Sequence, residues 1–247
     1  MLKTRIDPGS YIPFYVQVKD ALQAHIEQQG WRPGEQLPSE PELCEMFDVS
    51  RTVIRQALQE MEREGFITRR KGKGTFVAEP KIHEMLANKL TGFYHDMIAR
   101  GLTPVTRVLK QEIVPASDRI AAHLNLAVGE PVVEIERLRF VGDEPLVLVK
   151  SYLPYALCPE LADADLTLQS LYDFLEHTCN LTIAHGKRTI EAVSANEYEA
   201  HLLQVDLGAA LVQLDSITCL EDETPIEYYR AFHRGDRTRF EVELVRV

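Results

Sequence analysis

Cysteine is scarce in this chain, with four among 247 residues, and no two of them form a Cys-x-x-Cys pair. The eight histidines likewise show no His-x-x-x-His spacing. Neither a zinc site nor a framework of disulfides is indicated by such scattered residues. We therefore expect no metal, no cofactor, and free thiols in a reducing cytoplasm. The four positions are Cys44, Cys158, Cys179 and Cys219.

Long apolar runs are also absent, and the longest uncharged apolar stretches are short, as in Pro145–Val149. A membrane span needs roughly 20 mostly apolar residues, so no membrane partner is expected. Residues 1–10 carry three charges and lead into no apolar segment, which argues against a secretory signal. The 45% hydrophobic and 26% charged residues are typical of a globular protein. Length favours one or two domains, and we expect a cytoplasmic location.

Basic residues are outnumbered, with 27 Lys and Arg against 38 Asp and Glu, for a net charge of −11. That total argues against a nonspecific nucleic-acid coat. The deficit is uneven, because residues 1–80 hold 11 basic and 12 acidic side chains, whereas residues 81–247 hold 16 and 26. Within the first part, Ser50–Phe76 holds seven basic residues against three acidic ones. This distribution is compatible with a nucleic-acid reader that has a separate acidic domain.

The first 80 residues predict three helices followed by a two-stranded hairpin. Apolar residues spaced along 15–29 indicate one helical face, and Gly30 follows it as a cap. Ser39 and Glu42 form the pattern of a capping box that opens a second helix. Ser50 is a second N-cap, before a helix from Arg51 to about Glu64. The strands are expected at 66–70 and 75–78, around a glycine-rich turn.

The third helix is basic at its N-terminal end, which suits entry into the major groove of DNA. Arg51 and Arg55 are four residues apart and share a face, so one can reach guanine O6 and N7 while the other holds phosphate. The alternative is a solvated basic helix beside a sharp hairpin, both of which are common. The ordered combination favours DNA binding. The candidate contacts are Ser50, Arg51, Thr52, Arg55, Lys71, Gly72 and Lys73.

Beyond residue 79 the pattern changes to strands and short helices. We take 1–79 as a DNA-binding domain, 80–90 as a polar linker and 91–247 as a second domain. Hairpin-joined strands with interspersed helices predict an α+β fold on an antiparallel sheet. The expected strands are 105–114, 132–141, 146–153, 182–193, 210–219, 226–233 and 239–247. The expected helices are 93–100, 168–177 and one opened at 194–197 by a second capping box.

Several motifs resemble a known family. The segments at 37–43, 49–58, 64–67 and 72–77 resemble the winged helix of the GntR family. Those at 96–104, 136–140, 151–154, 225–228 and 234–237 resemble the UTRA effector domain of its HutC-type subfamily. The resemblance covers residues 10–247. It implies a homodimeric bacterial transcription regulator, expected to be a repressor. The effector domain would have a chorismate-lyase-like fold. The implied partners are double-stranded operator DNA with two half-sites and a small anionic metabolite.

Arg137 and Arg139 alternate on one expected strand and so project from the same face. Two neighbouring guanidiniums repel unless an anion or carboxylates lie between them. The partner could be Glu134, Glu136 or acids on a neighbouring strand. The resemblance favours an effector anion, because the family places such contacts on this strand. Tyr152 and Tyr172 could equally be half-buried structural residues. The effector contacts that the resemblance implies are Phe93, Tyr94, Arg137, Arg139, Tyr152, Ser170, Tyr172, Glu227 and His233.

At four positions the sequence differs from the family pattern, which limits what can be inferred from the resemblance. Pro41 and Val53 replace the usual Arg and Thr, so the operator sequence is not transferred. Val149 and His233 stand where many sugar-phosphate-binding members have Glu and Tyr, which argues against a hexosamine phosphate. A chorismate-lyase-like enzyme fused to a DNA-binding domain is the alternative. No nucleophile–base pair is visible, so we expect no enzyme. A metal sensor would be a third possibility.

Overall fold

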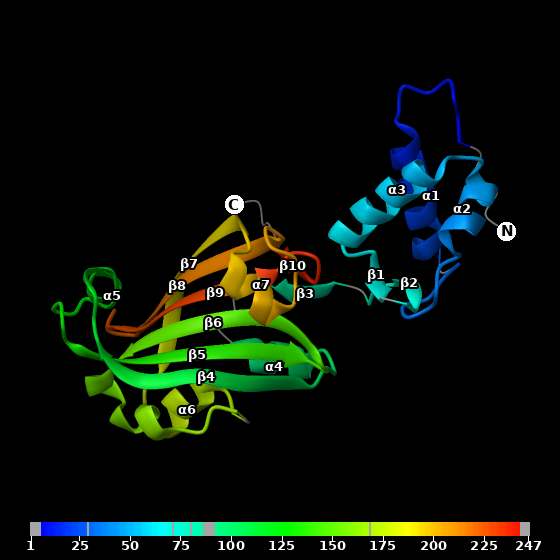
Figure 1. Cartoon of the computed structure of the whole chain (residues 1–247). Coiled ribbons are helices and arrows are strands. Elements are labelled where there is room, and N and C mark those ends of the chain that lie inside the picture. The colour runs from blue at the N-terminus through cyan, green and yellow to red at the C-terminus, as the bar shows by residue number, and fades with distance from the viewer. Residues whose placement is uncertain are drawn as a thin grey trace, which may run out of the picture. The chain divides into compact units, whose positions relative to one another are not determined.

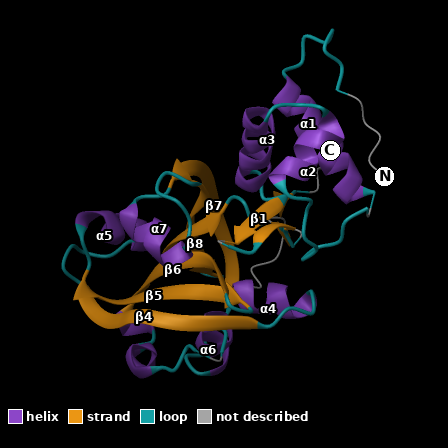
Figure 2. Cartoon of the chain, turned by 45° about the vertical axis from the view of Figure 1, so that its right-hand side comes forward, coloured by secondary structure: helices purple, strands orange, loops and turns teal. Residues whose placement is uncertain are grey.

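The computed structural model describes residues 6–28, 30–70, 72–79, 81–85, 92–167 and 169–242. The chain divides into two compact units, Met1–Ile82 and His83–Val247. The first is a helical unit with a small hairpin, and the second is built on one antiparallel sheet (Figures 1 and 2). The predicted α+β fold with an N-terminal winged helix-turn-helix is thereby confirmed. Among the described helices, none has the length and apolar character needed to cross a bilayer.

The first unit packs three helices around one apolar core. They are α1 (Phe14–Glu27), α2 (Glu40–Phe47) and α3 (Arg51–Arg63). The hairpin pairs β1 (Ile67–Arg70) with β2 (Gly74–Val77) in antiparallel register. The core side chains are almost fully buried and recur at helical spacing; they include Val18, Leu22, Leu43, Ile54, Leu58 and Met61. Burying these faces leaves the opposite face of α3 in solvent.

Side-chain caps define the short connection between α2 and α3. Ser39 and Glu42 form the predicted capping box, and Asp48 ends α2 in the left-handed conformation at φ 52°. Ser50 then caps α3, because its hydroxyl accepts a hydrogen bond from the Val53 amide at 3.5 Å. These local bonds start α3 at Arg51, as the sequence predicts.

The second unit is built on a six-stranded antiparallel sheet in the order β4-β5-β6-β9-β8-β7. Its strands are β4 (Pro104–Pro115), β5 (Pro131–Val141), β6 (Glu144–Pro154), β7 (Ile183–Ser194), β8 (Ala210–Leu220) and β9 (Pro225–Arg234). A separate two-stranded sheet pairs β3 (Ile82–Met85) with β10 (Thr238–Glu241). The helical elements are α4 (Gly92–Ala99), α5 (Asp118–Leu124), α6 (Leu171–His177) and α7 (Glu197–Leu203), with 3-10 turns η1 (Tyr155–Leu157) and η2 (Pro159–Asp163).

The sheet is covered differently on its two faces. On the face that we call the α6 face, α6, η1 and η2 pack against Val133 and Ile135 of β5. On the opposite face, which we call the α7 face, α7 packs against Leu138 and Leu148. The helix α5 covers the far end of that same face, around Val132. Along β5, side chains two residues apart therefore point to the same face of the sheet, and adjacent side chains point to opposite faces.

Several local predictions are corrected. The strand β3 falls within residues 80–90, which the sequence analysis treats as a linker; residues 80 and 86–90 lie outside the described part. The second capping box starts at Asn196, with Glu199, because Ser194 still belongs to β7. The elements α5, η1 and η2 were not predicted. Each is at most seven residues long, too short for a clear apolar period.

The expectation of four free thiols is wrong for one pair. Cys158, at the start of η2, and Cys179, just after α6, form a disulfide with their Cα atoms 5.5 Å apart. Cys44 and Cys219 are free. The pair is separated by 21 residues and is brought together by packing on the α6 face. No local sequence pattern predicts such a contact.

Candidate functional site

The N-terminal turn of α3 presents a polar surface that the core does not use. The side chains of Arg51 and Arg55 are 62% and 59% exposed, and Ser50 and Thr52 are exposed beside them. Ile54, on the opposite side, is fully buried and fixes the rotation of the helix. The predicted contacts on α3 therefore lie together on one accessible face, as insertion into a groove requires.

Glu40, at the start of α2, holds both arginines in place. Its Oε2 accepts hydrogen bonds from Nε of Arg51 at 2.8 Å and Nε of Arg55 at 3.0 Å. The Arg51 hydrogen bond, opposed by burial and aided by Arg55, lowers the pKa of Glu40. Glu40 was not predicted from the sequence, because 11 and 15 positions separate it from its partners and no periodicity links two helices.

The wing hairpin carries further basic residues. Lys73 is exposed, and Gly72 turns at φ +74°; Lys71 lies outside the described residues. The Gln36 amide donates to the Lys73 carbonyl at 3.0 Å. A Cβ on Gly74, at φ +116°, would come within 2.5 Å of that amide nitrogen. Glycine is favoured at 74 by this positive φ, whereas the Gln36 amide is the far end of a flexible side chain and can move aside.

The second unit contains a cavity on the α6 face of the sheet, with about 930 Å³ of empty space including its open mouth. Strands β5, β6, β8 and β9 form its floor, and α4 and the start of α6 supply walls. The predicted residues that line it are Phe93, Tyr94, Arg137, Arg139, Ser170, Tyr172, Glu227 and His233. The lining also includes residues that were not predicted from the sequence, among them Asp96, Thr106, Arg188 and Phe240.

Arg137 is the most deeply buried cation of this cavity, at 2% exposure. One terminal guanidinium nitrogen donates to the Ser151 hydroxyl at 3.1 Å, and Nε is buried with no hydrogen-bond partner in the described part of the chain. Burial, followed by the nearby charge of Arg139, lowers the pKa of Arg137 to about 9, while Glu227 raises it. Arg137 is therefore a protonated, incompletely bonded cation at neutral pH.

Two more guanidiniums border the same space. The Arg139 guanidinium lies 5.1 Å from the centre of the Phe93 ring, a cation–π contact between β5 and α4. Arg188 enters from β7, where Nε donates to the Ser216 hydroxyl at 2.9 Å. Its terminal nitrogen donates to the Tyr229 hydroxyl at 2.5 Å. Three arginines thus converge on one cavity, a concentration of positive charge that suits an anion.

The cavity has one deeply buried carboxylate. Glu227, 2% exposed, accepts a hydrogen bond from the Tyr172 hydroxyl at 2.9 Å. Burial, then the charge of Glu227, raises the pKa of Tyr172, so this phenol stays a donor. Nearby, Ser170 caps α6 through the Asp173 amide, and the Asp173 carboxylate binds His95 of α4 at 2.9 Å. These bonds hold the two walls together.

Tyr152 does not reach this cavity, contrary to the prediction. It is adjacent to Ser151, which bonds Arg137, and so points to the α7 face. There its hydroxyl donates to Glu134 at 3.5 Å and its ring stacks on Tyr228, with centroids 6.2 Å apart. We therefore remove Tyr152 from the candidate effector contacts.

The alternative partners for the arginine pair also lie on the α7 face. Glu134 binds Lys110 at 2.9 Å and Lys150 at 3.3 Å. Lys150 also binds Glu136 at 3.3 Å. Since these two glutamates alternate with Arg137 along β5, they point away from it. Neither one therefore reaches the arginines of the cavity, whose lining includes the carboxylates of Glu227 and Asp96.

Comparison with known proteins places both units. The family model "Bacterial regulatory proteins, gntR family" matches residues 14–77, and the UTRA domain model matches residues 99–239. The chain is 34% identical to the HTH-type transcriptional repressor NagR of Bacillus subtilis, over 95% of this chain and 96% of that protein. It is 30% identical to the histidine utilization repressor of Pseudomonas putida, over 93% and 91%. The crystal structure of PhnF from Mycobacterium smegmatis superposes with a TM-score of 0.66 at 28% identity, over 92% and 99%.

Proposed function

We propose that this chain binds an operator and releases it when a small anionic metabolite binds. The chain belongs to the GntR family of bacterial regulatory proteins and to its HutC-type subfamily, which has a UTRA domain. The relatives found are named as transcription repressors, which makes this chain a transcription regulator and not an enzyme. The alternative of a chorismate-lyase-like catalyst is therefore set aside. The buried guanidinium of Arg137 is the observation that supports an anionic effector.

The DNA-binding half of the proposal rests on α3. Arg51 and Arg55 each give only Nε to Glu40, which leaves their other nitrogens for guanine or phosphate. The wing, with Lys73 exposed, would contact the neighbouring backbone. Two half-sites lie about 34 Å apart along DNA, so we propose a homodimer that presents two such helices. Because bacterial operator DNA lies in the cytoplasm, we propose that the protein is located there.

The effector half rests on charge. Residues 81–247 carry 26 acidic and 16 basic side chains, so this unit as a whole repels anions. Against that background Arg137, Arg139 and Arg188 line one cavity with a single deeply buried carboxylate, Glu227. A phosphate or carboxylate of the ligand would complete the hydrogen bonding of Arg137. We propose a phosphorylated or carboxylated metabolite whose binding releases the operator.

The test uses the full-length protein and a double-stranded site selected from a random DNA pool. Melting curves and operator release are measured with a panel of sugar phosphates, phosphonates and carboxylates. Arg139→Ala is expected to keep operator binding and to lose both stabilisation and release by the active compound. Arg119→Ala, which alters an arginine on the α7 face, serves as the matched control. An active compound that still releases DNA from Arg139→Ala with unchanged potency would remove Arg139 from the effector site.

A further inference from the structure

The disulfide joins the two ends of a segment that forms one wall of the cavity. Cys158 lies between η1 and η2, and Cys179 follows α6, 21 positions later. The segment that the bridge closes contains η2, α6 and the residues that line the cavity at 169–172. The bridge is therefore a covalent restraint on a part of the chain that a ligand in the cavity would touch.

Only one sulfur of the bridge is accessible from solvent. Cys179 is partly exposed, and its neighbours Thr178 and Asn180 are exposed on either side of it. Cys158 is 2% exposed and packs in the apolar cluster of the α6 face. Thiol–disulfide exchange begins when a thiolate attacks one sulfur and the other sulfur leaves. The structure directs such an attack to Cys179, with Cys158 as the leaving sulfur.

The α6 face has other restraints that remain when the bridge opens. The Gln111 side chain donates to the Leu161 and Ala164 carbonyls at 2.8 and 3.0 Å, which fixes η2 against β4. Leu171 and Leu175 of α6 are buried in the same apolar cluster as Cys158. Opening the bridge is therefore expected to loosen this face without unfolding the unit.

The helix α6 is the part that depends most on the bridge. It has seven residues, fewer than the roughly 12–15 that an isolated helix needs to be even marginally stable in water. Its polar anchors to the rest of the unit include the Tyr172 hydroxyl on Glu227 at 2.9 Å and Asp173 on His95 at 2.9 Å. The bridge begins immediately after its last turn. Its order therefore comes from tertiary restraints, of which the disulfide is the strongest.

A disulfide has a particular meaning in the cytoplasm, where the proposed function locates this protein. Thiols are kept reduced there, and the disulfides that do form in cytoplasmic proteins are mostly transient, catalytic or redox-sensing. A permanent structural bridge would not be maintained in such a compartment. A bridge with one accessible sulfur, on a segment that is otherwise anchored, fits a reversible one.

We propose that Cys158–Cys179 is a redox modification site, which a small-molecule thiol opens, and that its state sets the affinity of the cavity for an anion. The attacking thiolate forms a bond to the Cys179 sulfur, the Cys158–Cys179 bond breaks, and the Cys158 sulfur leaves and takes up a proton. A second thiol attacks the mixed disulfide and releases Cys179. Two electrons and two protons pass to the protein, and the two small thiols leave as their disulfide.

The direction of the coupling follows from the wall. With the bridge closed, residues 169–172 are already ordered, so an anion binds without the entropic cost of ordering them. With the bridge open, part of the binding energy is used to order α6. The oxidised protein should therefore bind the anion more tightly and release the operator at a lower concentration. Because coupling is reciprocal, a bound anion should favour the disulfide by the same factor.

The modification itself is tested on the full-length protein in glutathione buffers that run from mostly oxidised to mostly reduced. Samples are acid-quenched, unfolded and alkylated, and mass spectrometry counts the alkyl groups. Wild type is expected to take up two groups at the oxidised end, on Cys44 and Cys219, and four at the reduced end. Cys158→Ala/Cys179→Ala, the control, should take up two throughout. A bridge that never forms, or that resists every buffer while the protein is folded, would overturn the site.

The coupling to the wall is tested by hydrogen exchange of oxidised and reduced wild type, without any ligand. Amides of α6 are expected to exchange at least about fivefold faster in the reduced protein, while those of α7 keep their rates. Cys158→Ala/Cys179→Ala should match the reduced wild type in every buffer. Equal exchange of α6 in the two redox states would overturn the coupling.

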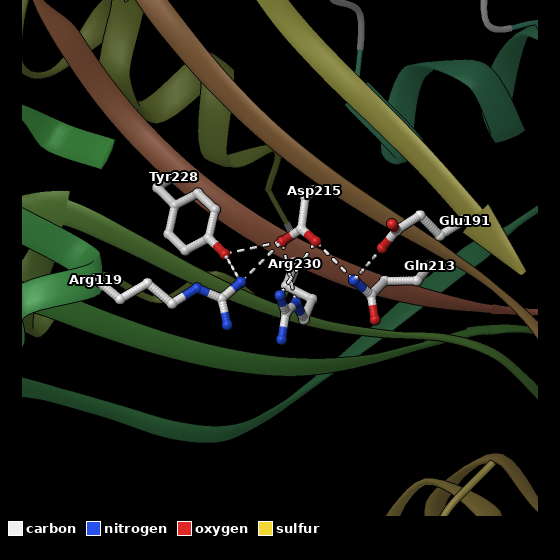
Figure 3. A network of polar contacts seen from close by, with 6 residues as sticks. All are labelled: Arg119, Glu191, Gln213, Asp215, Tyr228 and Arg230. Atoms are coloured by element: carbon white, nitrogen blue, oxygen red, sulfur yellow. Dashed lines mark hydrogen bonds and ion pairs between the residues drawn. The ribbon is translucent and has the colours of Figure 1, made fainter. Parts of the chain in front are cut away.

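A control on the α7 face separates the loss of the bridge from a general loss of stability. Arg119 of α5 donates to the Tyr228 hydroxyl, and both contact Asp215, which also accepts from Arg230 at 3.0 Å (Figure 3). Arg119→Ala removes these contacts and is expected to leave the difference in α6 exchange between the redox states unchanged. Oxidised Arg119→Ala with α6 exchange as fast as in reduced wild type would show that general stability orders α6, and would overturn the coupling.

Inorganic phosphate tests the link to the cavity, and this step rests on the proposed function. Melting curves at increasing phosphate concentration give its dissociation constant for each redox state, which is expected to rise about fivefold on reduction. Equal constants would overturn the coupling and leave the anion cavity intact. Phosphate that stabilises neither state would instead contradict the anion cavity of the proposed function, whereas the alkylation and exchange results would still decide the redox site.

Discussion

The two units use arginine in opposite states. Arg51 and Arg55 of the first unit are more than half exposed and share one carboxylate, Glu40. Arg137 of the second unit is 2% exposed, with one nitrogen bonded to Ser151 and Nε unbonded within the described structure. The first arrangement leaves charge in water, and the second removes it from water.

This difference indicates how each unit selects its partner. An exposed guanidinium is still hydrated and can exchange a carboxylate for a DNA phosphate at small cost, so its binding is strongly salt-dependent. A buried cation is costly until an anion and hydrogen bonds compensate it. The first unit is therefore suited to a long polyanion, and the second to one small anion that fits a cavity.

The largest expected effect concerns the exposed arginines. Arg51→Ala should weaken operator binding by about 1–3 kcal/mol per half-site, because a guanine contact would be lost. Gel shifts with the selected operator measure the change. Arg63→Ala, at the far end of the same helix and 72% exposed, is the matched control. Unchanged operator affinity in Arg51→Ala would contradict the assignment of α3 as the recognition helix.

The buried arginine gives the second-largest effect. Arg137→Met replaces a buried cation with an apolar chain and leaves the buried carboxylate of Glu227 with less positive charge beside it, which should lower the melting temperature. The active compound should no longer stabilise the protein, a loss of about 2.7 kcal/mol at a hundredfold excess over the wild-type dissociation constant. Melting curves with and without the compound measure both quantities. Stabilisation that persists in this variant would show that the anion binds elsewhere.

The wing gives a smaller and less selective effect. Lys73→Ala should weaken binding to all DNA sequences by a similar factor and reduce the slope of log affinity against log salt by about one per half-site. Titrations at several salt concentrations, with operator and with random DNA, measure the slope. A loss confined to the operator would instead assign Lys73 to base recognition.

Glu40 should oppose DNA binding in general. Glu40 competes with phosphate for Arg51 and Arg55. Glu40→Gln should therefore tighten binding to random DNA a few-fold and reduce the ratio of operator affinity to random-DNA affinity. Competition assays with both DNAs measure the ratio. Glu42→Gln, in the same helical turn, is the control for lost negative charge. Equal affinities in Glu40→Gln and wild type would exclude competition by Glu40.

The smallest effect is on acid stability. Arg51 lowers the pKa of Glu40, so the folded state holds this carboxylate ionised more firmly than the unfolded chain does. The resulting stability is present above the unfolded value of about 4.5 and is lost as pH falls through the lowered pKa. The difference in unfolding free energy between wild type and Glu40→Gln should therefore shrink as pH falls below about 4.5. Denaturant titrations over that range measure it, and a pH-independent difference would contradict the linkage.

Much of the architecture is local and was predictable. Apolar spacing and caps located α2 and α3 to within a residue or two, because hydrogen bonds such as those of Ser39 and Ser50 depend only on neighbours a few positions away. The main strands were predicted from runs of apolar and β-branched residues that are bounded by turn residues. The short α5 and the disulfide Cys158–Cys179 carry no such signal.

That Arg137 and Arg139 share a face is evident from their spacing alone, because side chains alternate along a strand. The spacing did not determine which face has the cavity. That choice depends on where α4 and α6 pack, which is why Tyr152 was placed on the wrong side and Arg188, from the far edge of the sheet, was missed. Glu40 was missed for the same reason. Contacts between residues on different elements arise only when the whole core assembles, and no short-range pattern records them.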